Sequence, residues 1–297
     1  MKDARDVLRT SYAECRRVAC GAGSNFTPCF YLLSRERRRA MEALYAFMRR
    51  TDDLVDGEAT SEDASRDLAE WREQTAAALA ETGFEADGQA SILPAVADVM
   101  ERFEISHEYL FAAIDGAEMD LTRQRYETFD ELSEYCYRVA TVVGLACLRI
   151  WGYEGNDPAE AAHACGMAFQ LTNILRDVRE DCDRGRVYLP QEDLRRFGYS
   201  EDELAAATVN GRFSELMAFQ IERVEGFYRE ATALGEGLER GGRRIFVMMV
   251  RVYHELLQQI KADPARVFSE KARVGSSKLL GIVLRMLLRP SVKAVLP

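Results

Sequence analysis

The sequence has few histidines and prolines, and it lacks the loop motifs that bind zinc or nucleotides. Its 297 residues include three histidines, seven prolines and seven cysteines, and no two cysteines are spaced as CxxC. This composition excludes the ligand spacing of zinc fingers. Neither GxxxxGK[ST] nor a GxGxxG that follows a strand is present. A P-loop and a Rossmann nucleotide fold are therefore not expected.

The chain also lacks a long apolar run, a leader segment and a flexible linker. No apolar stretch reaches the roughly 20 residues that a membrane-spanning helix needs. The first residues, MKDARDVLRTSY, show no signal peptide. Since no segment rich in glycine, serine and proline divides the chain, we predict a single domain over residues 1–297. The odd number of cysteines without a metal-binding pattern fits a reducing cytoplasm.

The net charge is −10, which argues against general nucleic-acid binding. Basic residues nevertheless gather in two places. The run RERRR covers residues 35–39, and residues 271–297 hold six basic side chains and no acidic one. Both runs are candidate contacts for anionic ligands or a membrane surface, and solvated charge is the alternative.

The sequence predicts helices almost throughout, because the period-2 alternation of strands is missing. Helix starts are indicated by Ser34, by Asp157-Pro158 and by the capping-box patterns Thr128–Glu131 and Ser200–Glu203. The helix that opens at Asp157-Pro158 should run to about residue 183. Further helices are predicted at 3–20, 62–83, 91–103, 107–122, 212–236 and 241–262.

Residues 136–150 and 161–175 are apolar on most helical faces, so both helices are expected in the middle of a bundle. In the first of them, Ala140 and Gly144 stand four residues apart. Small side chains at this spacing leave room either for close helix packing or for a ligand. His254 is expected on a polar helix face, and neither it nor the other histidines indicate a catalytic pair with serine or cysteine.

Two aspartate pairs are each spaced four residues apart. They are Asp52 and Asp56 in TDDLVD, and Asp177 and Asp181 in NILRDVREDCD. On a helix such residues share one face, where like charges cost about 0.2–0.5 kcal/mol per pair. A solvated acidic face is one interpretation. The other is a functional site, because both motifs end helices with long apolar stretches, where carboxylates need partners.

Polar residues accompany both pairs at helical spacing. Arg49 precedes Asp52 by three residues. The second pair continues a line formed by Gln170, Asn173, Asp177 and Asp181. Oxygen ligands without histidine or cysteine suit Mg²⁺, which binds one or two carboxylates and completes its shell with water and phosphate oxygens. The pattern predicts Mg²⁺ and a diphosphate substrate, whose remaining charge arginine and lysine would neutralise.

Three stretches closely resemble the squalene/phytoene synthase family: ALYAFMRRTDDLVD (43–56), YCYRVATVVGLACLRIWGY (135–153) and AFQLTNILRDVREDCDRGRVYLPQEDL (168–194). The resemblance extends from SNFTPCFYLL (24–33) to FSEKARVGSSKLL (268–280). It implies an all-α isoprenoid-synthase bundle around a central prenyl cavity, with two facing aspartate-rich helices that bind diphosphates through two or three Mg²⁺ ions. It also implies head-to-head (1-1′) condensation of two prenyl diphosphates through a cyclopropylcarbinyl diphosphate.

Carried over position by position, the resemblance assigns roles to individual residues. The metal motifs are matched by Asp52 and Asp56, and by Asn173, Asp177 and Asp181. Contacts to diphosphate are matched by Arg49, Arg176 and Arg186. Positions near the reacting carbons are Phe26, Tyr45, Tyr135, Gln170 and Tyr188, with Tyr253 as a further match. The prenyl tunnel is matched by Val139, Ala140, Val143 and Gly144. A basic patch that closes on phosphate is matched by Lys271, Arg273 and Lys278. Direct participation in catalysis is expected of Tyr45, Arg49, Asp52, Asp56, Asp177, Asp181 and Tyr188.

The family divides by substrate. Two farnesyl diphosphates give presqualene diphosphate and then squalene, for sterols or hopanoids, whereas two geranylgeranyl diphosphates give the carotenoid precursor phytoene without a reductant. The stretch at 135–153 looks closer to bacterial squalene-pathway enzymes, although YCYRVA, RGRVYLPQEDL and residues 268–280 also fit phytoene synthases. We expect the squalene branch and keep phytoene synthase as the alternative. The sequence does not decide whether NADPH is used.

More distant alternatives stay open. A terpene cyclase would share the fold and the metal, but its Nxxx[ST]xxxE pattern is replaced here by Asn173, Asp177 and Asp181. A chain-elongating synthase would carry a second DDxxD, which is absent. A non-catalytic helical lipid-binding protein would not need intact aspartates in both motifs.

The sequence leaves two further partners open. The segment LLGIVLRMLLRP (279–290) is either a core or capping helix or a helix resting on the bilayer surface. In the second case this basic C-terminal segment would give a cytoplasmic protein peripheral contact with the membrane. A downstream enzyme of isoprenoid synthesis is the other partner.

Overall fold

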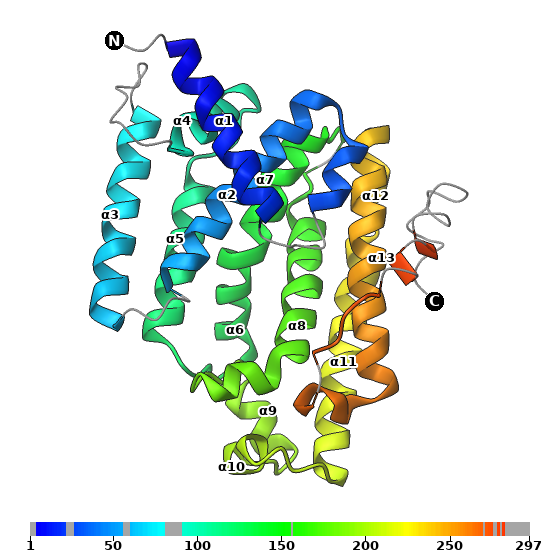
Figure 1. Cartoon of the computed structure of the whole chain (residues 1–297). Coiled ribbons are helices and arrows are strands. Elements are labelled where there is room, and N and C mark those ends of the chain that lie inside the picture. The colour runs from blue at the N-terminus through cyan, green and yellow to red at the C-terminus, as the bar shows by residue number, and fades with distance from the viewer. Residues whose placement is uncertain are drawn as a thin grey trace. The chain divides into compact units, whose positions relative to one another are not determined.

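A computed structural model describes residues 4–21, 27–55, 60–80, 91–155, 157–269, 271–275, 278–279 and 281–282. Within these ranges every regular element is helical, and strand-like pairing is limited to two isolated bridges, Arg125–Val187 and Tyr153–Leu238. The predicted all-α fold is confirmed (Figure 1). Backbone proximity divides the chain into two compact units, each described by itself below. The single domain therefore stays a prediction.

The first unit comprises residues 1–121, 145–154 and 238–245. Its helices are α1 (Ala4–Gly21), the 3₁₀ helix η1 (Thr27–Leu32), α2 (Arg35–Val55), α3 (Ser61–Ala80), α4 (Leu93–Arg102), α5 (Glu108–Thr122), most of α7 (Val142–Trp151) and the start of α13 (Arg240–Ala262). Helix α2 packs against α1, α3 and α4, so it forms the centre of this group.

The packing of α2 against α3 fixes the helical turn that precedes the first acidic motif. Phe47 is fully buried, and its ring centroid lies 5.3 Å from that of Trp71. The Trp71 indole Nε1 donates a hydrogen bond of 3.0 Å to Thr51 Oγ1, which in turn donates to the Phe47 carbonyl. Burial of one such large side chain contributes roughly 1.5–3 kcal/mol. This contact holds in place the turn that follows, which carries Asp52.

The second unit comprises residues 122–144, 155–237 and 246–297. Its helices are α6 (Phe129–Cys136), the π-helical turn η2 (Tyr137–Thr141), the first residues of α7, α8 (Ala159–Asp183), α9 (Gln191–Arg196), α10 (Glu201–Ala205), α11 (Gly211–Ala231), α12 (Leu234–Gly237), most of α13 and the 3₁₀ helix η3 (Pro264–Phe268). Helix α8 contacts α6, η2, α10, α11 and η3. The expected central place of this apolar helix is therefore confirmed within its unit.

A π-turn interrupts the long helix predicted around residues 136–150. The backbone N–H of Val142 donates to the Tyr137 carbonyl, five residues back instead of four. Against this turn lies Gly166 of α8, where an added Cβ would stand 2.6 Å from Thr141 Oγ1 and 2.8 Å from Thr141 Cα. By contrast, nothing lies within 4 Å of a Cβ built at Gly144. Close packing thus occurs at Gly166, and the space at Gly144 fits the ligand interpretation.

The helix starts are largely as predicted. The capping box at Ser200 and Glu203 is confirmed, because each side chain accepts a hydrogen bond from the backbone N–H of the other residue. The N-terminal proline of α8 differs from expectation. Pro158 occupies the N-cap rather than the first helical position, and Asp157 Oδ1 accepts from the Ala159 N–H at 3.0 Å. The aspartate still satisfies a free donor of the first turn.

Two other expectations are wrong. The helix predicted over 212–236 ends at Ala231, and a separate short helix, α12, follows. His254 is buried and not on a polar face, with the Tyr228 ring 5.4 Å from its own and with Gln258 Nε2 3.3 Å from its Nε2. Burial lowers the pKa of His254. Periodicity missed it because a histidine scores as polar whatever its neighbours are.

Among the described residues, no helix combines the length and the apolarity that crossing a bilayer requires. Most of the segment 279–290 lies outside the described residues. Its two interpretations, as a core or capping helix or as a helix on the bilayer surface, therefore stay predictions.

Gly166→Ala should lower the free energy of unfolding by about 1–3 kcal/mol, because the new Cβ meets backbone atoms of Thr141 that cannot move aside locally. Gly144→Ala is the matched control. It should leave stability unchanged or raise it by about 0.5–1 kcal/mol, since alanine is favoured over glycine inside a helix. Urea unfolding followed by circular dichroism measures both, and equal stability of the two variants would contradict the close approach.

Candidate active site

The first acidic motif lies at the C-terminal end of α2, in the first unit. Asp52 and Asp53 are exposed, and Asp56 lies outside the described residues, as does Phe26. Arg49 pairs with Asp53, with 2.7 Å between Nη2 and Oδ1. The sequence spacing had placed Arg49 beside Asp52, so the partner recorded for it is one residue further on.

One turn before Arg49, the half-buried Tyr45 meets Phe30 of η1 edge to face, with ring centroids 6.2 Å apart. Tyr45 and Arg49 are four residues apart on α2 and therefore share one helix face. The roles assigned to Tyr45 and Arg49 stay predictions.

The second acidic motif lies on α8, in the second unit, and its central carboxylate is held by two cations. Arg176 donates to both oxygens of Asp177, from Nε at 2.8 Å and from Nη2 at 2.6 Å. Lys271 Nζ lies 3.2 Å from Asp177 Oδ1 and 2.7 Å from Glu180 Oε2. Two-point guanidinium pairing of this kind is strong and directional. A diphosphate would compete for the same guanidinium and ammonium groups.

Asn173, one turn before Asp177, holds a polar atom without a partner. Its Oδ1 is buried and accepts no hydrogen bond from the described residues. Its Nδ2 makes only a long contact, 3.4 Å, to Gln170 Oε1. A buried acceptor without a donor costs roughly 1–3 kcal/mol. Because Asn173 Oδ1 belongs to a line of oxygen atoms on α8, this cost indicates a ligand that would bind the oxygen.

Asp181, one turn after Asp177, is poorly compensated. Its pKa is raised from 3.8 to about 7, first by burial and then by the negative charges of Asp177 and Glu180, against the opposing pull of Arg186 and Arg184. The backbone turns after Asp181, and the Arg186 N–H donates a hydrogen bond of 2.8 Å to the Asp181 carbonyl. The motif therefore contains one carboxylate, Asp177, that is paired with two cations, and another, Asp181, whose negative charge is not balanced by its surroundings.

The oxygen atoms of α8 fit a hard divalent cation. No three histidine, cysteine, aspartate or glutamate side chains in the described part of the chain gather closely enough to hold a metal by themselves. A metal on this face would instead use the Asn173 amide oxygen, one or two carboxylates, and oxygens supplied by water and phosphate. That donor set is the one Mg²⁺ prefers.

A groove of about 310 Å³ opens beside Asp177, between the end of α8 and residues 267–269 and 271. Its basic lining residues are Arg176, Arg179, Arg184 and Lys271. The rest of the predicted basic patch differs from Lys271. Lys278 pairs with Glu255 of α13, and Arg273 is exposed. Of the three basic positions, the structure brings only Lys271 to the acidic motif.

Tyr135 and Tyr188, which the resemblance placed near the reacting carbons, lie together in the second unit. Their rings are stacked at 5.3 Å, and both also contact the Tyr126 ring, at 5.5 and 5.9 Å. All three side chains are buried. Sequence reasoning missed Tyr126 because it stands in an irregular segment before α6, where no helical spacing ties it to either partner.

A second aromatic contact involves Tyr253. Its ring stacks on Phe169 at 4.5 Å, and Phe169 in turn lies 6.2 Å from Tyr228. Phe169 was also missed, although its position four residues before Asn173 placed it on the same side of α8. That spacing was the signal that could have found it.

The predicted tunnel residues fall at the π-turn and directly after it. Val139 and Ala140 lie in η2 and Val143 and Gly144 at the start of α7, and all four are half-buried. A π-turn inside an α-helix is often found at a functional site. Partial burial together with the open space at Gly144 is compatible with a surface that contacts an apolar ligand.

The family model described as squalene/phytoene synthase matches residues 21–278 of this chain. The chain belongs to the squalene/phytoene synthase family. It is therefore a prenyltransferase of the squalene/phytoene synthase type, and the family joins prenyl diphosphates head to head. Family members generally depend on a divalent metal, in agreement with the oxygen donors of α8.

Similar proteins with curated names agree with this assignment. A phytoene synthase from Arthrospira platensis is 37% identical over 90% of this chain and 89% of its own length. A 15-cis-phytoene synthase from Synechocystis sp. is 37% identical over 92% and 83%. Among such relatives the phytoene name favours our alternative over the expected squalene product.

Solved structures show the same fold. A dehydrosqualene synthase matches with a TM-score of 0.81 and 26% identity, over 98% of this chain and 98% of its own. The squalene synthase HpnC from Alicyclobacillus acidocaldarius matches with a TM-score of 0.79 and 24% identity, over 88% and 98%. The second likeness supports the fold alone.

In metal-free protein, Asp181→Asn should be more stable than wild type above pH 7. The folded-state pKa is raised to about 7, so wild type is stabilised by the bound proton below pH 3.8 and loses this stability as the pH rises through 7. Three pKa units set an upper limit of about 4 kcal/mol. Denaturant unfolding in EDTA at pH 5 and pH 8 measures the difference.

Asp183→Asn is the matched control for this measurement. Asp183 is exposed on the same helix and pairs with Arg179 at 2.9 Å, so its loss should bring no gain at high pH. A stability difference between Asp181→Asn and wild type that does not change with pH would contradict the raised pKa.

Proposed function

We propose that this chain is a phytoene synthase that condenses two geranylgeranyl diphosphates to phytoene. The observation that carries the proposal is the 37% identity to relatives named phytoene synthase over at least 90% of this chain. In the proposed reaction one diphosphate leaves, and the C2–C3 double bond of the second substrate attacks the allylic cation. The resulting tertiary cation loses a proton as the cyclopropane ring closes, which gives a cyclopropylcarbinyl diphosphate. This intermediate loses its own diphosphate, rearranges and releases a second proton to give phytoene.

Mg²⁺ is the proposed metal. In the second unit it would be held by Asn173, Asp177 and Asp181, and in the first unit by Asp52 and Asp56. Bound Mg²⁺ would stabilise the negative charge of a departing diphosphate. The unsatisfied Asn173 oxygen and the raised pKa of Asp181 support this assignment, because a divalent cation would relieve both.

The basic residues of α8 would exchange partners when substrate binds. Arg176 and Lys271 pair with Asp177. A divalent cation on Asp177 would compete with these pairs, so that the guanidinium and the ammonium could contact the phosphate oxygens instead. Arg186, whose charge already acts on Asp181, would join them. Charge-assisted bonds to phosphate would then orient the leaving group.

The buried aromatic residues would protect the carbocations. Tyr135 and Tyr188 present stacked rings with Tyr126 behind them. Ring faces attract positive charge by about 0.5–2 kcal/mol. A dry aromatic wall also keeps water from capturing the cation. Burial of the prenyl chain contributes about 0.8 kcal/mol per methylene, which requires apolar lining such as Val139 and Val143.

The squalene branch is the second candidate. The dehydrosqualene synthase that matches over 98% of this chain favours it, although its 26% identity is lower than that of the phytoene synthases. The two candidates differ in substrate length and in reductant. Phytoene needs none, so we propose that NADPH is not used.

A water-insoluble product also needs a route out of the protein. We propose that the chain works in the cytoplasm and meets the membrane surface peripherally through its basic C-terminal segment. There it would pass phytoene to the next enzyme of isoprenoid synthesis. Vesicle sedimentation with and without anionic lipid tests the contact.

Asp177→Asn should abolish turnover, by about a thousandfold or more, while helical content stays near that of wild type. The variant loses a carboxylate that we assign to the metal and releases Arg176 and Lys271 from their present partner. Asp52→Asn should behave in the same way. Steady-state product formation and circular dichroism measure both properties, and Glu160→Gln, an exposed change on α8, is the control. Substantial activity in either aspartate variant would show the metal assignment to be wrong.

Product analysis by mass spectrometry tests the substrate. Purified protein and Mg²⁺ are incubated with farnesyl or geranylgeranyl diphosphate, each with and without NADPH. We expect phytoene from the C20 substrate, independent of NADPH. Presqualene diphosphate, dehydrosqualene or squalene from the C15 substrate would support the second candidate. A cyclic or elongated product would reject head-to-head condensation.

A further inference from the structure

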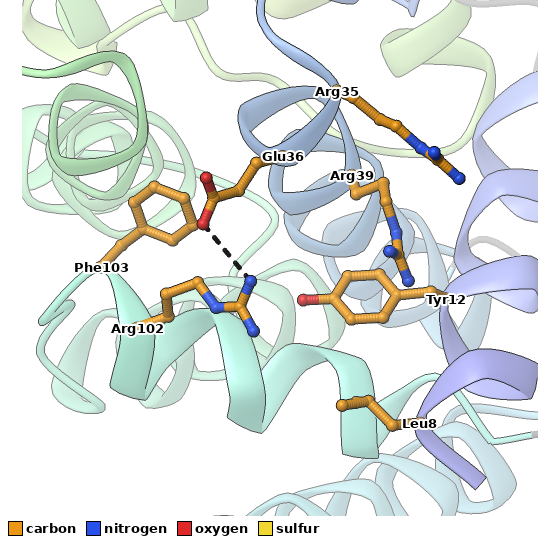
Figure 2. Close-up of a pocket in the computed structure, with 7 residues that line it drawn as sticks. All are labelled: Leu8, Tyr12, Arg35, Glu36, Arg39, Arg102 and Phe103. Carbon is orange, nitrogen blue, oxygen red and sulfur yellow. Dashed lines mark hydrogen bonds and ion pairs between the residues drawn. The ribbon is translucent and has the colours of Figure 1, made fainter. Parts of the chain in front are cut away.

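A second pocket, of about 460 Å³, lies in the first unit between α1, α2 and α4 (Figure 2). It is lined by the N-terminal end of α2, whereas Asp52 stands near the other end of the same helix. The rise of an α-helix places Arg39 and Asp52 about 20 Å apart along the axis. None of the residues assigned to the reaction lines this pocket.

Three arginines line the pocket, and one of them is neutralised. Arg102 lies 3.3 Å from Glu36 Oε1 and 3.1 Å from Asp98 Oδ1. For Arg35 and Arg39, no carboxylate of the described residues lies within ion-pair distance. The arginines of the run RERRR at 35–39 thus fall into two groups, those that line the pocket and those that form ion pairs. Its two central arginines are paired elsewhere in the unit, Arg37 with Glu239 and Arg38 with Glu42.

Arg39 stacks on an aromatic ring and forms no ion pair with the described residues, although the charge of Glu42 acts on it from a greater distance. Its guanidinium lies 4.0 Å from the centroid of the Tyr12 ring. That ring is buried, and the Tyr12 hydroxyl donates to Asp98 Oδ2 at 2.5 Å. Figure 2 shows the Arg39 guanidinium above the face of Tyr12. A guanidinium oriented in this way loses less conformational entropy when it binds a ligand.

The helix itself adds positive potential at the same place. Arg35 is the first residue of the 21-residue helix α2, and the pocket opens at this N-terminus. The helix dipole favours a negative charge there, although Ser34 Oγ already accepts from the Arg37 N–H. Leu8 and Phe103 add apolar surface to the lining. The pocket therefore combines two guanidinium groups outside ion pairs, the N-terminus of α2 and apolar lining residues.

We propose that this pocket binds a phosphate ester, in which Arg35 and Arg39 contact the phosphate and an apolar lining residue, Leu8 or Phe103, contacts the attached carbon skeleton. Guanidinium groups match the geometry of phosphate oxygens and form charge-assisted hydrogen bonds to them. The ester is either a free small molecule or the headgroup of an anionic phospholipid. The site is independent of the proposed condensation, so neither proposal falls with the other.

Calorimetric titration of the full chain with inorganic diphosphate in EDTA tests the free-molecule source. Cosedimentation with phosphatidylcholine vesicles, with and without phosphatidylglycerol, tests the headgroup. The variants are Arg35→Gln/Arg39→Gln, the single Arg35→Gln, and the charge-matched control Arg66→Gln on α3. Arg35→Gln changes an exposed side chain without a recorded partner, so it keeps the test valid if loss of Arg39 disturbs folding. Arg176→Gln reports any diphosphate bound at the active site.

We expect the double variant to weaken one of the two probes by at least about tenfold, the effect of losing charge-assisted hydrogen bonds. Arg35→Gln should give part of this loss, Arg66→Gln should keep the binding, and Arg176→Gln should remove only diphosphate bound at the active site. Loss of diphosphate binding identifies a free phosphate ester, and loss of vesicle binding identifies a lipid headgroup. If both probes bind the double variant as they bind wild type, or if only Arg176→Gln removes binding, the proposal is overturned.

Discussion

The charge balance along α8 is the constraint on which the candidate active site depends. This largely buried helix carries three acidic side chains within five residues near its C-terminal end, and Asp177 and Glu180 each have two close cations. Asp181 is left with a raised pKa, and Asn173 with an unsatisfied oxygen. These costs are tolerable because the apolar face of α8 is packed on several sides. Stability from the core thus maintains a polar face that is incomplete without a ligand.

Helical spacing alone predicted the line from Gln170 to Asp181, because residues three and four apart share a face wherever a helix forms. The same rule could not find Lys271, which reaches α8 from a segment outside regular helices and was assigned only through family resemblance. Tyr126 escaped both approaches, since its stacking depends on how an irregular segment folds back. Spacing is informative within an element, whereas contacts between elements depend on packing that one sequence does not display.

Substrate length was the least predictable property, and there is a physical reason. In the proposed site the acidic motifs and their arginines would act on diphosphate, which is the same group in the C15 and C20 substrates. Chain length is instead distinguished by apolar side chains that contact the prenyl tail. Each buried methylene changes the binding free energy by about 0.8 kcal/mol. No short motif reports such a difference. Similarity over the whole chain is sensitive to many of these positions at once, and it favours the longer substrate.

The π-turn at Tyr137–Thr141 amounts to one residue inserted into an α-helix. Its consequence concerns the rotational register of this helix. Without the insertion, Val143 and Gly144 would be turned by about 100° around the helix axis relative to Tyr135. In a comparison of sequences, a gap of a single residue in this stretch would therefore mark a change in which side chains face the ligand, although the neighbouring letters stay the same.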